Sequence, residues 1–407
     1  MILPRYALFA ALLAAAGLPI YIHAPKFYVD EYGLGLAEIG VALMLLRLID
    51  VVQDPFLGRL AGRLQARRGF AAFVAAFGLA SGMVGLFAVT PPFAPLVWMG
   101  ICLVILFTSF SFLTILFYAR GIPQARALGS TGHVRLAGWR ETGALLGVSL
   151  ACILPFMLER AGLPPYAGFA ASFVLLTLVA TAWMHPIWSG PVEVPGLGFS
   201  SLLRDPEIRR LLLVAILNAA PVAVTSTLFL FFVEYRLEQP AMAGPYLLTF
   251  FVAAALAAPF WSRAAQKFDA TRILSAGMLL SVFAFAWAFF LGAGDGTAFL
   301  LICIASGAAL GADMTLLPAM FSHRVAEIDG NGGEAFGLWN FCSKFTLALA
   351  AVTALPLLES AGFQAGAQNS VAALTRLSVL YALLPCALKI AALLLLNVGP
   401  KRKFVKC

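Results

Sequence analysis

Long apolar runs separated by short polar segments recur along the whole chain. A helix that crosses the hydrocarbon of a bilayer needs about 20 apolar residues, so each run predicts one membrane-spanning helix. The first run is interrupted by Gly17, Pro19 and Pro25, and a membrane tolerates such residues where they line a cavity or pack on protein. The predicted helices cover residues 5–29, 36–61, 70–90, 93–119, 134–157, 166–188, 208–235, 243–264, 270–293, 296–323, 333–360 and 371–397.

Composition favours a membrane protein with twelve helices over a soluble domain. Hydrophobic residues make up 62% of the 407 residues and charged residues 11%, and the mean hydropathy is +0.94. A soluble domain carries about 25% charged residues to keep its surface wet. We therefore expect an all-α membrane protein with short loops. No small-residue cleavage site precedes Tyr21, so we expect the first helix to be retained.

The two halves of the chain repeat one another at an offset of 204 residues. The matched pairs are Pro55 and Pro259, Phe56 and Phe260, Arg59 and Arg263, Ala61 and Ala265, Arg63 and Lys267, Arg120 and Arg324, and Arg140 and Lys344. Duplicated halves are typical of transporters that rock about a central site, and this pattern looks like the major facilitator fold of two six-helix pseudo-symmetric halves. We expect an N-terminal bundle at 1–190, a central cytoplasmic loop at 191–207 and a C-terminal bundle at 208–407.

Basic residues predict the orientation, because translocating them across the membrane is unfavourable. With the N-terminus inside, 19 basic residues fall in inside segments and 4 in outside segments. The inside residues are Arg5, Arg59, Arg63, Arg67, Arg68, Arg120, Arg126, Arg135, Arg204, Arg209, Arg210, Arg263, Lys267, Arg272, Arg324, Lys401, Arg402, Lys403 and Lys406; the outside residues are Lys26, Arg160, Arg236 and Arg376. Both termini are therefore expected in the cytoplasm. This topology also accounts for the net charge of +8 without a nucleic-acid partner.

Two aspartates and an arginine share one face of the second predicted helix, because Arg47, Asp50 and Asp54 are spaced at i, i+3 and i+7. A charge at the bilayer centre costs at least about 2.5–3.5 kcal/mol, so such residues face protein or water. Two neighbouring carboxylates repel unless they share a cation, a proton or an arginine. Na⁺ is one candidate, with Gln53 and Thr114 as further oxygen ligands, and a proton is another. A structural alternative pairs Arg47 with Asp50 and leaves Asp54 to cap a loop.

Arg140 and Lys344 are repeat-related cations inside predicted helices, so they are candidates to face each other across a central cavity. There they would hold a polar or anionic substrate by charge-assisted hydrogen bonds. Alternatively, Arg140 pairs with its neighbour Glu141, and Lys344 neutralises the acids of the second helix. Aromatic rings that stack on sugar faces are a third substrate-binding feature. The candidates of this kind are Tyr118, Trp139 and Trp339.

Further charged residues are assigned with less detail. Arg120 and Arg324 are grouped with Arg47 as coupling or gating residues. Lys389 is expected to extend its amine to the membrane interface and to be structural, and Asp313 receives no role. The four histidines and six cysteines form no ligand cluster or disulfide pattern.

Three sequence blocks resemble the glycoside–pentoside–hexuronide:cation symporter family, which is melibiose-permease-like and belongs to the major facilitator superfamily. They are Phe27-Tyr28-Val29-Asp30 with Arg47-Leu-Ile-Asp50-Val-Val-Gln-Asp54-Pro55, Arg135-Leu-Ala-Gly-Trp-Arg140 with Gly143-Ala-Leu-Leu-Gly147, and Gly333-Glu-Ala-Phe-Gly-Leu-Trp339-Asn-Phe-Cys-Ser-Lys344-Phe. The resemblance implies that Asp50 and Asp54 bind the coupling cation, with help from the Thr114 hydroxyl. It also implies that Arg140 and Lys344 line the substrate and coupling region.

The chain also departs from this family. Gln53 stands where the family has asparagine, and Phe117 stands where helix four would carry a carboxylate. The first helix has no acid before Asp30. In the family those missing carboxylates bind sugar hydroxyls, so their absence counts against a galactoside substrate. The acidic loop before helix eleven survives in part, as Glu327, Asp329 and Glu334.

These features predict a secondary active transporter of the inner membrane that works by alternating access. We expect symport of a small polar, sugar-like or anionic solute with Na⁺ or H⁺, in a monomer surrounded by membrane lipid and without a cofactor beyond the coupling ion. Arg140 and Lys344, without the acids of helices one and four, favour an anionic or lipid-like solute. Alternatives are a proton-driven exporter of amphipathic compounds, a lysolipid transporter and a transport-dead membrane sensor. The sequence shows no P-loop, nucleophile elbow or metal-ligand cluster, so no enzyme is expected.

Overall fold

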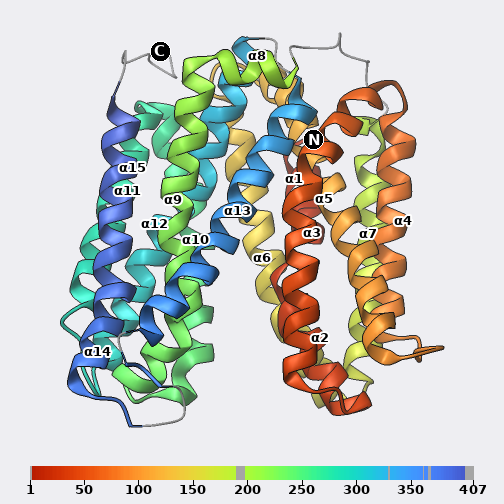
Figure 1. The fold of residues 1–407 in the computed structure, drawn as a ribbon. Coiled ribbons are helices and arrows are strands. Elements are labelled where there is room, and N and C mark those ends of the chain that lie inside the picture. Colours follow the sequence, from red (N-terminus) through yellow and green to blue (C-terminus); the bar gives the residue numbers. More distant parts are fainter. Residues whose placement is uncertain (1, 189–197, 329–330, 361, 365–367, 399–407) are drawn as a thin grey trace. The chain divides into compact units, whose positions relative to one another are not determined.

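The computed structural model describes residues 2–188, 198–328, 331–360, 362–364 and 368–398. Nearly all of these residues are helical, and none of them lies in a β-strand. Figure 1 shows the helices in chain order. Their bounds are α1 (Leu3–Ala15), α2 (Leu18–Tyr32), α3 (Leu36–Arg63), η1 (Gln65–Arg67), α4 (Arg68–Phe87), α5 (Pro95–Ala127), α6 (Gly132–Arg160), α7 (Pro165–Trp188), α8 (Phe199–Arg204), α9 (Pro206–Phe231), η2 (Phe232–Arg236), η3 (Pro240–Met242), α10 (Ala243–Lys267), α11 (Ala270–Ala288), α12 (Gly296–Glu327), α13 (Gly332–Glu359), α14 (Val371–Ser378), η4 (Val379–Leu383) and α15 (Leu384–Asn397).

Every predicted range is occupied by helix. Within the described residues, nine helices are long and apolar enough to cross a membrane. The predicted interruption of the first helix is found at Gly17, whose ψ of −111° is not helical and separates α1 from α2. Helix α5 continues to Ala127, past its predicted end at 119, and α12 continues to Glu327, past 323. The apolar pattern marks the part of a helix that lies in hydrocarbon, and the backbone stays helical in the polar region beyond it.

The chain divides into two compact units, and unit 1 comprises Met1–Leu128, Trp139–Leu202 and Val325–Phe341. In unit 1, α5 packs against α3 and α4, and α7 packs against α4 and α1. Helix α6 lies directly on α1. A Cβ atom on Gly143 or Gly147 would come within 2.1 or 2.4 Å of a backbone oxygen of α1. This Gly-x-x-x-Gly spacing lets the two backbones approach closely.

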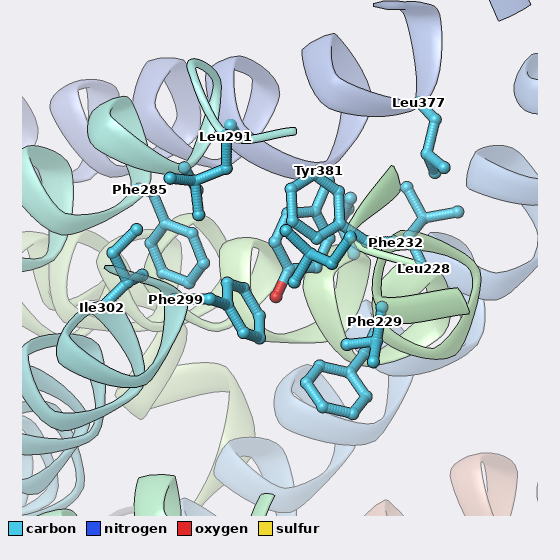
Figure 2. Close-up of a cluster of buried hydrophobic side chains, with 14 of the residues drawn as sticks. Leu228, Phe229, Phe232, Phe285, Leu291, Phe299, Ile302, Leu377 and Tyr381 are labelled. Atoms are coloured by element: carbon cyan, nitrogen blue, oxygen red, sulfur yellow. The ribbon is translucent and has the colours of Figure 1, made fainter. Parts of the chain in front are cut away.

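Unit 2 comprises Gly129–Gly138, Leu203–Arg324 and Cys342–Cys407. In it, α15 packs against α9 and α11. Its hydrophobic core contains a cluster of aromatic rings, in which Phe232 and Tyr381 stack with ring centroids 4.1 Å apart (Figure 2). Both rings come from π-helical turns, η2 and η4, which continue α9 and α14. Such turns are rare and occur mostly as single-turn insertions in α-helices, and here they bring two large rings into one core.

Candidate functional site

A network of hydrogen bonds joins α3 to α5 around Asp50 in unit 1. The Gln53 Nε2 and the Ser111 Oγ both donate to Asp50 Oδ1 at 2.9 Å. The Thr108 Oγ1 donates to Gln53 Oε1, also at 2.9 Å. Asp50 is buried, with 8% of its surface exposed, and Ser111 is fully buried. These donors fix the position of the carboxylate, and the cluster gathers the carboxylate, amide and hydroxyl oxygens that a hard cation prefers.

Asp54 lies one turn further along α3 and is fully buried, and the first part of α13 passes beside it within unit 1. A Cβ atom on Gly337 would lie 2.9 Å from the backbone oxygen of Asp54 and 2.9 Å from the Cα of Gly58. A Cβ atom on Gly333 would lie 3.0 Å from the Gly58 oxygen. Glycines on both helices therefore allow a very close approach. The first residues of the α13 block that carries the family resemblance therefore pack on the α3 backbone at Asp54 and Gly58.

A second polar cluster lies where α5 and α6 meet in unit 1. The Arg140 Nε donates to Glu141 Oε1 at 2.7 Å, and the Tyr118 hydroxyl donates to the same oxygen at 3.2 Å. The Arg140 guanidinium carbon lies 3.8 Å from the centre of the Tyr118 ring, a cation–π arrangement. Arg140 and Glu141 are buried, with 5% and 2% of their surfaces exposed. The pairing of Arg140 with Glu141, which the sequence left open, is therefore what the structure shows.

One face of α5 carries polar side chains from both clusters. Thr108, Ser111, Thr114 and Tyr118 follow each other at spacings of three or four residues, so they lie on one side of the helix. They span about 15 Å of the helix axis at the rise of an α-helix. The Thr114 hydroxyl donates to the Phe110 backbone oxygen at 2.7 Å, which leaves its own oxygen able to accept. Thr108 and Ser111 were not predicted, because isolated hydroxyl residues carry no distinguishing signal in an apolar helix.

The other predicted substrate residues are placed differently. Trp139 is 46% exposed beside the buried Arg140, whereas Trp339 is buried on α13 with 9% of its surface exposed. Lys344 is half-buried on the part of α13 that belongs to unit 2. The side chain of Arg47 lies outside the described residues. The predicted arrangement of Arg140 facing Lys344 stays a prediction.

The repeat-related arginines Arg120 and Arg324 have different partners. In unit 1 the Arg120 Nε donates to the backbone oxygen of Ile187 at 2.9 Å, near the C-terminus of α7. In unit 2 the Arg324 Nη2 binds Asp205 Oδ2 at 2.5 Å, and Asp205 is the N-cap of α9. Each arginine therefore holds one end of a helix. Their assignment to coupling or gating stays a prediction.

The expectation that Lys389 extends its amine to the membrane interface is wrong, whereas the expected structural role agrees with its ion pair. Lys389 is buried with 1% of its surface exposed, and its Nζ donates to Asp313 Oδ2. It lies eight residues before the end of α15 at Asn397, or about 12 Å along the helix axis, and its amine turns to Asp313 within unit 2. Its partner Asp313 had no assigned role and now has a structural one. Elsewhere in unit 2, His133 Nδ1 lies 2.9 Å from Ser322 Oγ, and its ring lies 5.4 Å from that of His323, a contact that the sequence did not indicate.

Two curated relatives of the chain are symporters. It is 26% identical to the inner membrane symporter YicJ of Escherichia coli (strain K12) over 288 residues, which cover 65% of this chain and 62% of that protein. The match therefore spans less than two thirds of the length of that relative. It is 21% identical to the uncharacterized symporter YnaJ of Bacillus subtilis (strain 168) over 421 residues, which cover 91% of this chain and 85% of that protein.

Solved structures with the same fold are major facilitator transporters. The E. coli fucose:proton symporter FucP has a TM-score of 0.67 at 14% identity, covering 98% of both chains. A bacterial homologue of the iron transporter ferroportin, outward-facing and soaked with iron, has a TM-score of 0.71 at 14% identity, covering 96% of this chain and 98% of that one. At such identities the likeness concerns the fold alone. The fold class predicted from the sequence is confirmed: this is an all-α protein with the major facilitator fold.

A comparison with sequence models of protein families identifies the family within this class. The model described as MFS/sugar transport protein matches residues 5–398. The chain therefore belongs to the MFS/sugar transport family, and its resemblance to the glycoside–pentoside–hexuronide:cation symporters is confirmed.

Proposed function

We propose that this protein is a secondary active transporter that couples the movement of a small polar solute to Na⁺ or H⁺ bound at Asp50 and Asp54. The observation that carries the proposal is the buried acid pair on α3, with Asp50 held by Gln53 and Ser111 and with α13 packed directly on the backbone at Asp54. A charge change at this pair acts on a helix contact built from glycines, which has little room to adjust. The names of two relatives, both called symporters, support the same conclusion.

The solute is proposed to bind at the Arg140 cluster, which the polar face of α5 connects to the acid pair. Coupling requires that cation and solute favour the same conformations, because a ligand shifts an equilibrium only by its differential affinity for the two states. Along α5, Thr114 lies between Ser111 of the Asp50 network and Tyr118 of the Arg140 cluster. We place the protein in the inner membrane as a monomer, with both termini in the cytoplasm.

The first experiment measures the melting temperature of the purified protein in sodium and in potassium salts across a range of pH. A ligand that binds only the folded state stabilises it by RT ln(1 + [L]/Kd), or about 2.7 kcal/mol at a concentration of 100 Kd. We expect a sodium-specific rise that is lost in Asp50→Asn and in Asp54→Asn. Asp295→Asn, at an exposed loop acid, is the matched control and should keep the rise.

A proton at the acid pair would instead give a melting temperature that depends on pH and not on sodium, with a pH dependence that changes in Asp50→Asn or Asp54→Asn. That result would retain the acid pair as the coupling site and would fit the proton-driven exporter as well as a proton symporter. A melting temperature that responds neither to sodium nor, through these aspartates, to pH would contradict the proposal.

A further inference from the structure

The charge of Arg140 is balanced by its neighbour in sequence. Arg140 Nε and Glu141 Oε1 are 2.7 Å apart, and both side chains are more than nine-tenths buried. Adjacent residues on a helix usually diverge, but here both side chains turn toward α5, where the Tyr118 hydroxyl joins the same carboxylate oxygen. The pair has no net charge. The sequence-based expectation of an anionic solute, which counted Arg140 as an unbalanced cation, therefore loses one of its two supports.

A donor within this cluster has no partner of its own. Arg140 Nη2 is buried and makes no hydrogen bond to any described atom, although the Nε of the same guanidinium is paired. Leaving a buried donor unsatisfied is unfavourable, so this group requires an oxygen acceptor from a ligand or an ordered water. The acceptor that Nη2 requires must sit beside the Glu141 carboxylate, because both groups belong to one ion pair.

The neighbouring carboxylate limits what that acceptor can be. A hydroxyl group both donates and accepts, so one hydroxyl of a ligand can accept from Arg140 while it or an adjacent hydroxyl donates to Glu141. A carboxylate on the ligand only accepts, and Glu141 would repel it in a site of low dielectric.

We propose that Glu141 is a specificity-determining residue that accepts a hydrogen bond from a solute hydroxyl and makes this site select neutral, hydroxyl-bearing solutes over carboxylate anions. In this proposal, Glu141 binds solute hydroxyls in place of the carboxylates that are missing from helices one and four. The proposal rests on the proposed function only in taking the Arg140 cluster as the solute site, and it does not depend on the identity of the coupling ion.

The test uses pairs of sugars that differ only at one carbon. The melting temperature of the purified full-length protein is measured with D-glucose against D-glucuronate and with D-galactose against D-galacturonate. Each pair exchanges a CH₂OH group for a carboxylate. Wild-type protein should be stabilised by at least one neutral member and not by its uronate. In Glu141→Gln, the ratio of the uronate Kd to the neutral-sugar Kd should fall at least about tenfold, which corresponds to about 1.4 kcal/mol. Glu159→Gln, an exposed glutamate on the same helix, should leave this ratio unchanged.

Three results would overturn the proposal: stabilisation of the wild type by a uronate more than by its neutral partner, no stabilisation by any of the four sugars, or an unchanged ratio in Glu141→Gln. The wild-type comparison stands by itself if Glu141→Gln does not fold. Running the panel in sodium and in potassium separates this proposal from the proposed coupling. If the cation proposal is wrong and the Glu141 proposal is right, the protein selects neutral sugars equally in both salts. If the Glu141 proposal is wrong and the cation proposal is right, sodium still raises the melting temperature of the sugar-free protein.

Discussion

At the scale of single residues, Asp313 and Lys389 form a buried ion pair in which each side chain neutralises the charge of the other. Both are buried in unit 2, between α12 and α15, and Asn218 of α9 is a polar neighbour of the pair. Removing one partner leaves a buried charge without compensation, which costs about 3–5 kcal/mol, whereas removing both charges is often neutral or stabilising. We expect Asp313→Asn and Lys389→Met each to lower the melting temperature strongly, and the double variant to recover most of the loss.

Thermal unfolding of the four proteins forms a double-mutant cycle that measures this coupling. Lys26→Met with Asp30→Asn is a matched control, because that i, i+4 pair is exposed and should couple weakly. If the double variant at Asp313 and Lys389 is as unstable as the sum of the two single variants, the ion pair does not account for their burial.

Spacing along one helix is sufficient to predict which residues share a face of it. Asp50, Gln53 and Asp54 share a face of α3 because of their sequence spacing alone, and the structure gathers the first two into one network. The partners from α5 were missed because the register between two neighbouring helices is set by packing, which a single sequence does not state. Lys389 was misplaced for the same reason, since its partner Asp313 is 76 positions away.

At the scale of elements, the N-cap residue of α9, Asp205, also forms an ion pair with Arg324. Asp205 Oδ1 accepts from the backbone N–H of Ile208 at 2.9 Å, and Arg324 binds the same carboxylate. Burial raises the pKa of the Asp205 carboxyl, but the hydrogen bonds from Arg324 and Ile208 and the charge of Arg324 outweigh it, so the pKa lies below its ordinary value. The folded state then binds fewer protons than the unfolded state as the pH falls, and stability is lost through the lowered pKa, below about pH 4.

Two substitutions separate the cap from the ion pair. Asparagine caps helices about as well as aspartate, so Asp205→Asn should lose the ion pair and its acid dependence but keep the cap. Asp205→Ala should lose both, with a further cost of about 1 kcal/mol for the cap. Melting temperatures at pH 7 and at about pH 2.5, below the ordinary pKa of an aspartate, check this order, with Asp269→Asn at the cap of α11 as control. Equal acid sensitivity of wild type and Asp205→Asn would show that another group titrates.

The bounds of most helices follow from hydropathy, but their irregularities do not. The break between α1 and α2 could be predicted from Gly17 and the nearby prolines, because these residues disfavour a regular helix through their own backbone properties. The π-helical turns η2 and η4 have no such signal. The stacking of Phe232 on Tyr381 that accompanies them joins positions 149 residues apart. Tertiary packing of this kind is invisible in the pattern of one segment.

At the scale of the whole molecule, the two repeats have diverged at equivalent places. Asp50 and Asp54 correspond to Ala254 and Ala258 on α10, which are fully buried. A Cβ atom on Gly311 of α12 would lie 2.7 Å from the Ala254 oxygen. Unit 2 therefore packs α10 and α12 closely through small residues where unit 1 holds a polar network between α3 and α5. This divergence inside a shared fold supports the proposal that the cation site lies in unit 1.

The distribution of basic residues makes a prediction about how the whole molecule lies in the membrane. Of the 27 lysines and arginines, 19 fall in segments expected inside and 4 in segments expected outside, so the segment between α3 and α4 should face the cytoplasm and the one between α6 and α7 the outside. Ala66 and Ala161 are exposed alanines in these two segments.

To test the orientation, each of these alanines is replaced by cysteine in a protein from which the six native cysteines have been removed. A membrane-impermeant maleimide should label Ala161→Cys but not Ala66→Cys in intact cells, and the reverse in everted vesicles. Labelling of Ala66→Cys in intact cells would invert the orientation and with it the direction of the proposed symport.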